Sequence, residues 1–278
     1  MGALSNAYEL VEADAGSPRA CAFFLHGILG SRRNWLSFAR RIVSKHPQWR
    51  LVLVDLRNHG ESHGAPGPHT LSACAQDLGE LAAHLGEEPS AVVGHSFGGK
   101  VALVYARDIA SELDDLWVLD SSPGKYVPTG TGSVEQVIRT ISSLPLPIAG
   151  RRELVRDLTA QGLSMSLAQW MTTNLRPTAE GFVWRFDLDA VREMLLDYAQ
   201  NDLWTLVESP SADYRVHFVQ GGRSDRWTAA DNERLARGRQ AGLDLHILAN
   251  AGHWVHTDDP DGLYAAMEPT WSRKPHQI

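Results

Sequence analysis

Short apolar runs rich in β-branched residues alternate along the chain with segments whose apolar residues recur at helical spacing. The runs that predict buried strands lie at residues 21–25, 50–54, 90–93, 116–119, 215–219 and 243–248. The first two helical segments between them end at Pro47 and at Gly86, two residue types that stop helices. This alternation predicts an α/β fold with a mostly parallel central sheet flanked by helices.

The alternation stops between residues 124 and 210. This stretch has helical periodicity, turn residues at 128–132 and a capping box from Ser133 to Gln136, but no run typical of a buried parallel strand. We therefore predict a helical cap (lid) at residues 125–209, inserted into a core domain made of residues 1–124 and 210–278. Seven large side chains of the cap would either line an apolar pocket over the site or pack the cap's own core: Met165, Trp170, Met171, Trp184, Phe186, Met194 and Trp204.

Composition excludes several classes of partner. The 278 residues are 43% hydrophobic and carry a net charge of -7, which argues against a nucleic-acid or anionic-membrane surface. No apolar run has the roughly 18 residues of a transmembrane helix, and no secretory leader is evident. The two cysteines, Cys21 and Cys74, lie in apolar segments and predict buried thiols in a reducing compartment. We expect an intracellular protein, cytoplasmic or organellar, with a mitochondrion or plastid as the organelle if a transit peptide precedes Met1. The oligomeric state is not predicted.

Residues 90–99 combine a strand-like run with the pattern Gly-x-Ser-x-Gly and then a helical segment. This is the pattern of a nucleophile elbow, in which Ser96 sits on a strained turn and glycines flank it because a side chain would collide there. The amide of Phe97 would then face a developing oxyanion. A second amide, that of Ile28, would come from the glycine-flanked loop at 26–31.

A serine hydroxyl needs a general base, and the base needs a carboxylate to orient it. His253 is the predicted base because it lies in a loop of small residues directly after the last predicted strand. Two carboxylates compete for the third role. Asp225 follows the next-to-last strand and Asp120 ends the strand before the cap, and either could reach the histidine.

Other interpretations of these motifs are possible. Residues 94–100 also match a phosphate-binding loop, but Val101 stands where a magnesium ligand would need a hydroxyl. A glycine-rich turn without chemistry is a further alternative. A zinc site at His59, His63 and His69 lacks the accompanying motif or cysteine pair.

Taken together, these motifs resemble the α/β-hydrolase superfamily, and more narrowly the subgroup of abhydrolase domain-containing protein 11 and the YbfF-type esterases. The resemblance lies in residues 26–31, 55–62, 94–100, 184–188 and 251–256. It implies an α/β-hydrolase fold and esterase or thioesterase activity without a metal or an organic cofactor. In the bacterial branch the acid matches Asp120, beside a serine that matches Ser224, whereas this chain also has Asp225. The resemblance therefore does not decide between the two carboxylates, and we favour Asp120 slightly.

The predicted function is that of a serine hydrolase that cleaves a small acyl ester or thioester through an acyl-enzyme on Ser96. Substrate contacts are expected from His26, Leu29, Trp184 and Trp254. A protein that keeps this fold but only binds a ligand, as a receptor or scaffold, is the alternative from another class.

Overall fold

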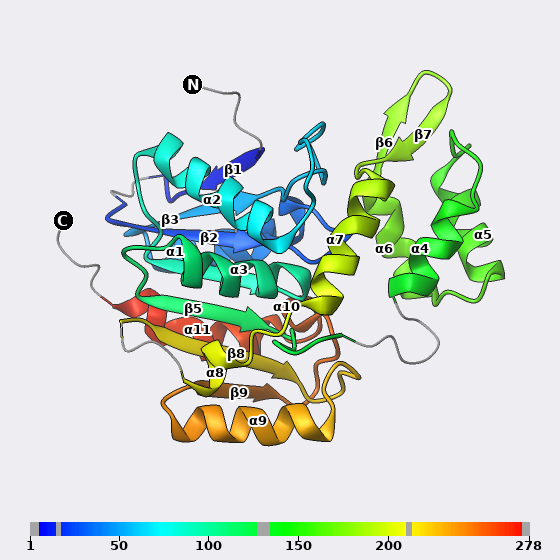
Figure 1. The fold of residues 1–278 in the computed structure, drawn as a ribbon. Coiled ribbons are helices and arrows are strands. Elements are labelled where there is room, and N and C mark those ends of the chain that lie inside the picture. The colour runs from blue at the N-terminus through cyan, green and yellow to red at the C-terminus, as the bar shows by residue number, and fades with distance from the viewer. Residues whose placement is uncertain (1–5, 15–17, 127–133, 210–212, 274–278) are drawn as a thin grey trace.

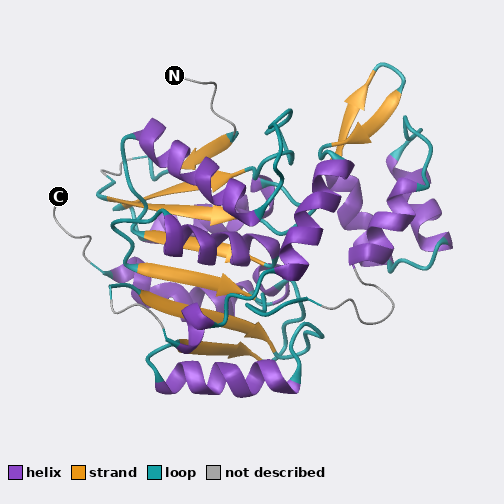
Figure 2. Ribbon diagram, in the orientation of Figure 1, coloured by secondary structure: helices purple, strands orange, loops and turns teal. Residues whose placement is uncertain are grey.

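The computed structural model describes residues 6–14, 18–126, 134–209 and 213–273. Its centre is a sheet with the strand order β1-β3-β2-β4-β5-β8-β9, shown in Figures 1 and 2. The edge strand β1 runs antiparallel to β3, and every other neighbouring pair is parallel. The strands are β1 (Tyr8–Val11), β2 (Ala20–Leu25), β3 (Trp49–Val54), β4 (Ala91–His95), β5 (Asp115–Leu119), β8 (Arg215–Gly221) and β9 (Asp244–Leu248).

The sheet confirms the predicted fold class. All six predicted strands are present, with ends that differ from the prediction by at most two residues. They could be recognised because the central strands are buried on both faces and therefore consist of continuous apolar runs, as in β2, where every residue is buried. Strand β1 was not predicted, since it is a partly exposed edge strand without such a run.

Helices cover both faces of the sheet. One apolar core joins the sheet to α2, α3 and α9, and a second core joins the opposite face to α1, α10 and α11. Helix α2 begins where Thr70 accepts a hydrogen bond from the Ala73 amide and ends at Gly86, whose φ is 66°. The bounds are η1 (Arg32–Trp35), α1 (Leu36–Lys45), α2 (Leu71–Leu85), α3 (Phe97–Asp108), α9 (Ala229–Gln240), α10 (Val255–Asp258) and α11 (Pro260–Ser272).

Between β5 and β8 the chain leaves the sheet. Helices α4, α5 and α6 and a two-stranded hairpin lie beyond the carboxyl ends of the parallel strands (Figure 1). They share an apolar core of their own, which includes Leu154, Leu158 and Leu175. The elements are α4 (Val134–Ser142), α5 (Arg151–Ala160), α6 (Met165–Met171), η2 (Thr172–Asn174), β6 (Leu175–Thr178), β7 (Gly181–Trp184), α7 (Leu188–Gln200) and α8 (Thr205–Glu208).

The hairpin β6–β7 was not predicted in a segment expected to be helical, because each of its strands has only four residues and only Leu175 and Trp184 in them are buried. The predicted turn at 128–132 and the start of the capping box at Ser133 lie outside the described residues. The boundaries of an inserted cap at 125–209 stay a prediction, but Leu203 and Val207, near its end, pack into the core beside α2 and α3.

Most of the seven large side chains considered for the pocket serve as core. Five of them are buried in an apolar cluster: Met171, Trp184, Phe186, Met194 and Trp204. Met165 is exposed. Only Trp170 lines the cavity described below.

The buried Lys100 of α3 connects the start of the segment between β5 and β8 to the end of α7. Its Nζ donates hydrogen bonds to the carbonyl oxygens of Gly124 at 2.6 Å, Tyr198 at 2.8 Å and Asn201 at 2.9 Å. Gly124 lies soon after β5, and the other two residues lie at the end of α7. Burial lowers the pKa of Lys100 to about 8, so the amine is still mostly protonated at neutral pH and all three of its N–H groups are used.

Replacement of Lys100 should therefore destabilise the fold. We expect Lys100→Met to lower the free energy of unfolding by about 3 kcal/mol or more, because three carbonyl oxygens lose their donor in a largely buried site. Denaturant unfolding followed by circular dichroism measures this. Lys45→Met, which removes an exposed lysine from α1, is the control and should cost less than about 1 kcal/mol. Equal losses in both variants would contradict this role of Lys100.

Candidate active site

Ser96 occupies a sharp turn between β4 and α3. Its backbone φ is 52°, which is an unfavourable value for any residue other than glycine. The turn is possible because the backbones around it approach closely. A Cβ at Gly94 would lie 2.1 Å from the Gly98 carbonyl oxygen, and a Cβ at Gly98 would lie 2.6 Å from the His26 carbonyl oxygen. Both glycines of the motif are thus required by space, as the sequence pattern predicted.

The structure brings Ser96 and His253 together from positions 157 residues apart in the chain. The Ser96 Oγ lies 3.1 Å from the His253 Nε2, and the His253 Nδ1 lies 2.8 Å from the Asp120 Oδ2. The carboxylate can only accept, so Nδ1 carries a proton and Nε2 of the neutral ring accepts from the serine hydroxyl. This is the arrangement that a nucleophile and its general base require.

Asp120 is the carboxylate in contact with His253. Its side chain is fully buried and also accepts hydrogen bonds from the Gly221 amide at 2.9 Å, the Ser224 Oγ at 2.5 Å and the Trp227 Nε1 at 2.7 Å. Four donors therefore surround a buried anion. This arrangement fixes the carboxylate and stabilises its charge.

The competing carboxylate, Asp225, points toward solvent. Its side chain is 82% exposed, and its Oδ1 lies 3.4 Å from the Nε of the neighbouring Arg226. It belongs to the wall of the same cavity. The geometry brings His253 to Asp120 and not to Asp225.

Ser96 and His253 open into a cavity of about 310 Å³ between the sheet and the segment that follows β5. Apolar side chains from both sides form much of its wall, and the ring centroids of Trp170 and Trp254 lie 6.1 Å apart there, with the ring planes tilted by 43°. Among the residues expected to contact substrate, His26, Leu29 and Trp254 line this cavity.

Trp184 does not line the cavity. It is buried in the core of the inserted segment, where it stacks on Phe186 with the ring centroids 5.2 Å apart. The geometry therefore does not support the prediction that Trp184 binds substrate. Its apolar surface is used in packing, which sequence alone could not distinguish from a place in the pocket wall.

The loop after β2 carries Ile28, which lines the cavity beside Phe97. Leu29 has a φ of 62°, and its amide donates to the Nε2 of His59 at 3.2 Å. At the start of the same loop, the Nε2 of His26 accepts from the Leu56 amide at 3.0 Å.

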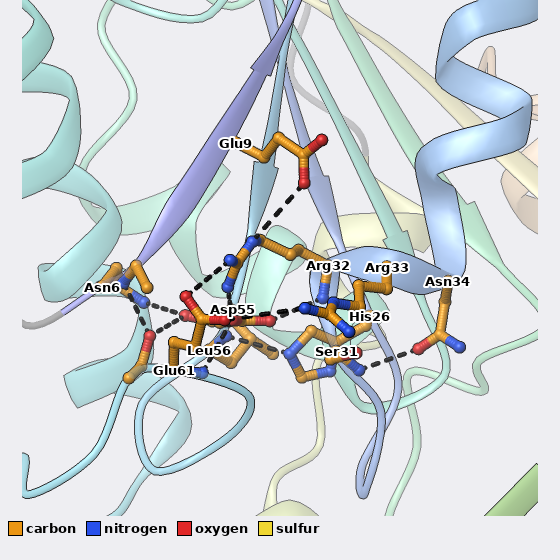
Figure 3. Close-up of polar contacts among 12 residues, drawn as sticks. Asn6, Glu9, His26, Ser31, Arg32, Arg33, Asn34, Asp55, Leu56 and Glu61 are labelled. Carbon is orange, nitrogen blue, oxygen red and sulfur yellow. Dashed lines mark hydrogen bonds and ion pairs between the residues drawn. The ribbon is translucent and has the colours of Figure 1, made fainter. Parts of the chain in front are cut away.

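The far end of the loop is held by Asp55, as Figure 3 shows. This buried carboxylate accepts from the Arg32 amide at 2.7 Å and forms an ion pair with the Arg32 guanidinium. The Ser31 amide donates to the Asn34 side chain at 2.8 Å. The backbone around Ile28 is therefore anchored on both sides.

Both histidines of this anchor act as acceptors and must be neutral. Burial is the main cause that lowers the pKa of His26 to about 4 and that of His59 to about 3. In each ring the Nδ1 contacts a backbone carbonyl oxygen, of Gly27 for His26 and of Arg57 for His59, which leaves Nε2 as the acceptor. The polar loop that suggested a zinc site thus uses His59 in backbone hydrogen bonds.

Sequence reasoning missed two neighbours of the candidate base. The Nε2 of His95 lies 2.8 Å from the His253 carbonyl oxygen, and Trp227 donates to Asp120. No motif marks either residue: His95 occupies a variable position of the elbow pattern, and Trp227 lies in a loop.

Metal and phosphate chemistry gain no support from the part of the chain that the structure describes. No group of three or more His, Cys, Asp or Glu side chains in it could hold a metal ion. The lysine of the alternative phosphate-binding loop, Lys100, is buried and fully hydrogen-bonded to carbonyl oxygens, which argues against that interpretation.

Cys21 and Cys74 are free and buried. Among the described helices, none is long and apolar enough to cross a membrane.

Fold and site together define an α/β hydrolase. Residues 22–266 match the model of the alpha/beta hydrolase family, and the chain belongs to this family. The predicted family is thus confirmed.

Among curated proteins, the chain is similar to the sn-1-specific diacylglycerol lipase ABHD11 of Mus musculus, with 31% identity over 94% of this chain and 83% of the relative. It is also similar to the esterase YbfF of Escherichia coli (strain K12), with 27% identity over 87% of this chain and 89% of the relative. Among solved structures, a marine microorganism esterase has the same fold, with a TM-score of 0.80, 23% identity and coverage of 96% of this chain and 99% of that one. The names of these relatives support the predicted class of enzyme, a carboxylic ester hydrolase.

The neutral state of His59 leads to a test by pH. Between pH 6.5 and about 3, the unfolded chain binds a proton at this residue that the folded chain does not, so stability falls as the pH falls. We expect His59→Gln, which keeps an acceptor but cannot be protonated, to reduce the slope of unfolding free energy against pH in this window by up to about 1.4 kcal/mol per pH unit. Urea unfolding at a series of pH values measures the slope. A slope equal to that of the wild type would show that His59 is not a buried neutral base.

Proposed function

We propose that this chain hydrolyses carboxylic esters or thioesters through an acyl-enzyme on Ser96. The observation that carries the proposal is the chain of contacts from the Ser96 Oγ to the His253 Nε2 and from the His253 Nδ1 to Asp120. In the first step Oγ bonds to the substrate carbonyl carbon while its proton passes to Nε2. The tetrahedral intermediate then expels the alcohol or thiol, which takes that proton from His253.

Water completes the cycle. His253 accepts a proton from a water molecule, whose oxygen attacks the acyl carbon, and the proton returns to Ser96 Oγ as the carboxylic acid leaves. In this proposal Asp120 keeps the Nδ1 proton in place and stabilises the imidazolium, which its burial and its four donors support. Asp225 takes no part, because its side chain points to solvent.

The developing oxyanion would be bound by the amides of Phe97 and Ile28. Phe97 is the first residue of α3, where backbone N–H groups have no partner within the helix. Ile28 lies in the loop that His59 and Asp55 hold in place, which supports a preorganised donor. Preorganisation matters because the donor must already point at the carbonyl oxygen when its charge develops.

An acyl chain is the substrate group that the cavity suits best. Its wall includes Leu167 and Trp170 of α6 and Leu195 of α7, so the segment after β5 would act as a lid over the acyl group. The mouse relative is named a diacylglycerol lipase and the bacterial relative an esterase, which supports ester substrates here as well. A thioester would react by the same steps.

Loss of the nucleophile tests the mechanism. Ser96→Ala should lower ester hydrolysis by at least about 10⁴-fold and abolish labelling by a fluorophosphonate probe, because the Ser96 Oγ is the hydroxyl that contacts His253 Nε2 in the described structure. Release of 4-nitrophenol from its butanoate ester, with circular dichroism as the check of folding, provides the measurement. Hydrolysis that persists in this variant would refute the acyl-enzyme, whereas probe labelling of a wild type without turnover would point to a ligand-binding receptor or scaffold.

The two carboxylates can be separated by matched substitutions. Asp120→Asn should lower kcat by about 10³- to 10⁴-fold, since an amide can present its NH₂ group to the histidine and favour the wrong tautomer. Asp225→Asn should change kcat by less than about threefold, because an exposed ion pair contributes little. A larger loss in the Asp225 variant would transfer the role of the acid to that residue.

A further inference from the structure

Among the described residues, the wall of the cavity that contains Ser96 has five ordinarily charged side chains other than histidine: Asp120, Asp225, Asp231, Lys125 and Arg226. Two of these acids, Asp120 and Asp231, are hydrogen-bonded to the protein. Asp120 accepts four hydrogen bonds, and Asp231 accepts from the amide and hydroxyl of Thr228 and from the hydroxyl of Ser122. The charges left to interact with a ligand are therefore two cations and the solvent-facing Asp225.

Arg226 has weak contacts for a guanidinium that is three-quarters covered. Its Nε lies 3.4 Å from Asp225 Oδ1 without forming a hydrogen bond, and its Nη1 lies 3.4 Å from the Tyr126 hydroxyl. The Nε is buried and has no hydrogen-bond partner among the described residues. Arg226 and Ser96 both line this cavity.

Two other arginines of this chain show how a guanidinium with a structural role is hydrogen-bonded. Arg57 donates to both oxygens of Asp77 at 2.7 and 2.9 Å, and Arg234 donates to both oxygens of Glu208 at 2.9 and 2.7 Å. Each forms the paired hydrogen bonds that suit a planar fork and a carboxylate. Arg226 has no such partner in the described structure, although it lies in the wall of the cavity.

We propose that Arg226 binds an anionic group of the substrate, a carboxylate or a phosphate, while the ester or thioester carbonyl lies at Ser96. The inference rests on the proposed function and narrows its substrate class to acyl compounds that carry a negative charge. An oxyanion in the cavity would accept from the Nη1–H and Nη2–H groups of the fork, since the Nε is buried. Lys125, in the same wall, adds to the positive potential.

The anionic group could belong to the acyl part or to the alcohol or thiol part of the substrate. Two matched pairs of esters separate these sources. Phenyl pentanoate and the mono-phenyl ester of glutaric acid differ by a carboxylate at the end of the acyl chain. Phenyl pentanoate and the pentanoate ester of 4-hydroxybenzoic acid differ by a carboxylate on the leaving group.

The readout is the ratio of kcat/KM for the anionic ester to that for the neutral ester, measured for the wild type and for three variants. Arg226→Met should lower this ratio by about tenfold or more in at least one pair, because a charged hydrogen-bond partner is lost. Arg226→Lys should lower it less, since it keeps the charge but not the fork. Arg223→Met removes an exposed arginine of the same loop that does not line the cavity, and should change the ratio by less than about twofold.

The outcomes distinguish failure of anion recognition by Arg226 from failure of the proposed hydrolase function. A fall in the ratio for one pair assigns the anion to the acyl part or to the leaving group, and either result supports the inference. If the wild type hydrolyses phenyl pentanoate but Arg226→Met leaves both ratios unchanged, anion recognition by Arg226 is refuted and the proposed function stands. If the wild type hydrolyses none of these esters, the proposed function falls, and this inference falls with it.

Discussion

The arrangement of the site depends on one buried anion, the carboxylate of Asp120. A charge that is fully removed from water is tolerated only if hydrogen bonds replace its hydration. Here the donors come from the Gly221 amide at the end of β8, from the loop that carries Ser224 and Trp227, and from His253. The need to satisfy this anion therefore fixes three segments that are more than a hundred residues from it in sequence.

The histidine held in this way meets a serine whose own position is set by backbone packing. Gly94 and Gly98 allow β4 and α3 to approach so closely that Ser96 must project from the turn between them. Carboxylate and elbow are formed on neighbouring strands, β5 and β4, which pair in parallel from Ala91 to His95. Because the carboxyl ends of parallel strands lie at one edge of the sheet, strand pairing alone brings both groups to the same place.

This explains how much could be predicted from the sequence. The buried strands and the elbow produce patterns that depend on neighbours in the chain, such as continuous apolar runs and Gly-x-Ser-x-Gly, so both were recognised. The choice between Asp120 and Asp225 depends on which loop turns toward His253, and no local pattern records that direction. The same limit applies to Trp184 and Lys100, whose roles are decided by packing against residues far away in the sequence. Strand β1 and the hairpin β6–β7 were not predicted because their strands have only four residues each and few of these residues are buried.

Three imidazoles meet beside the nucleophile, yet the proposed chemistry requires a charge on only one of them. The rings of His253 and His256 each lie 4.8 Å from that of His95. Burial is the largest cause that lowers the pKa of His95 and His256, the latter to about 4, and neither ring contacts a carboxylate in the described structure. Only His253 has Asp120 against its Nδ1. In the proposed chemistry a proton taken from Ser96 would therefore be stabilised on His253, and the neutral rings around it would add no like charge to oppose the transfer.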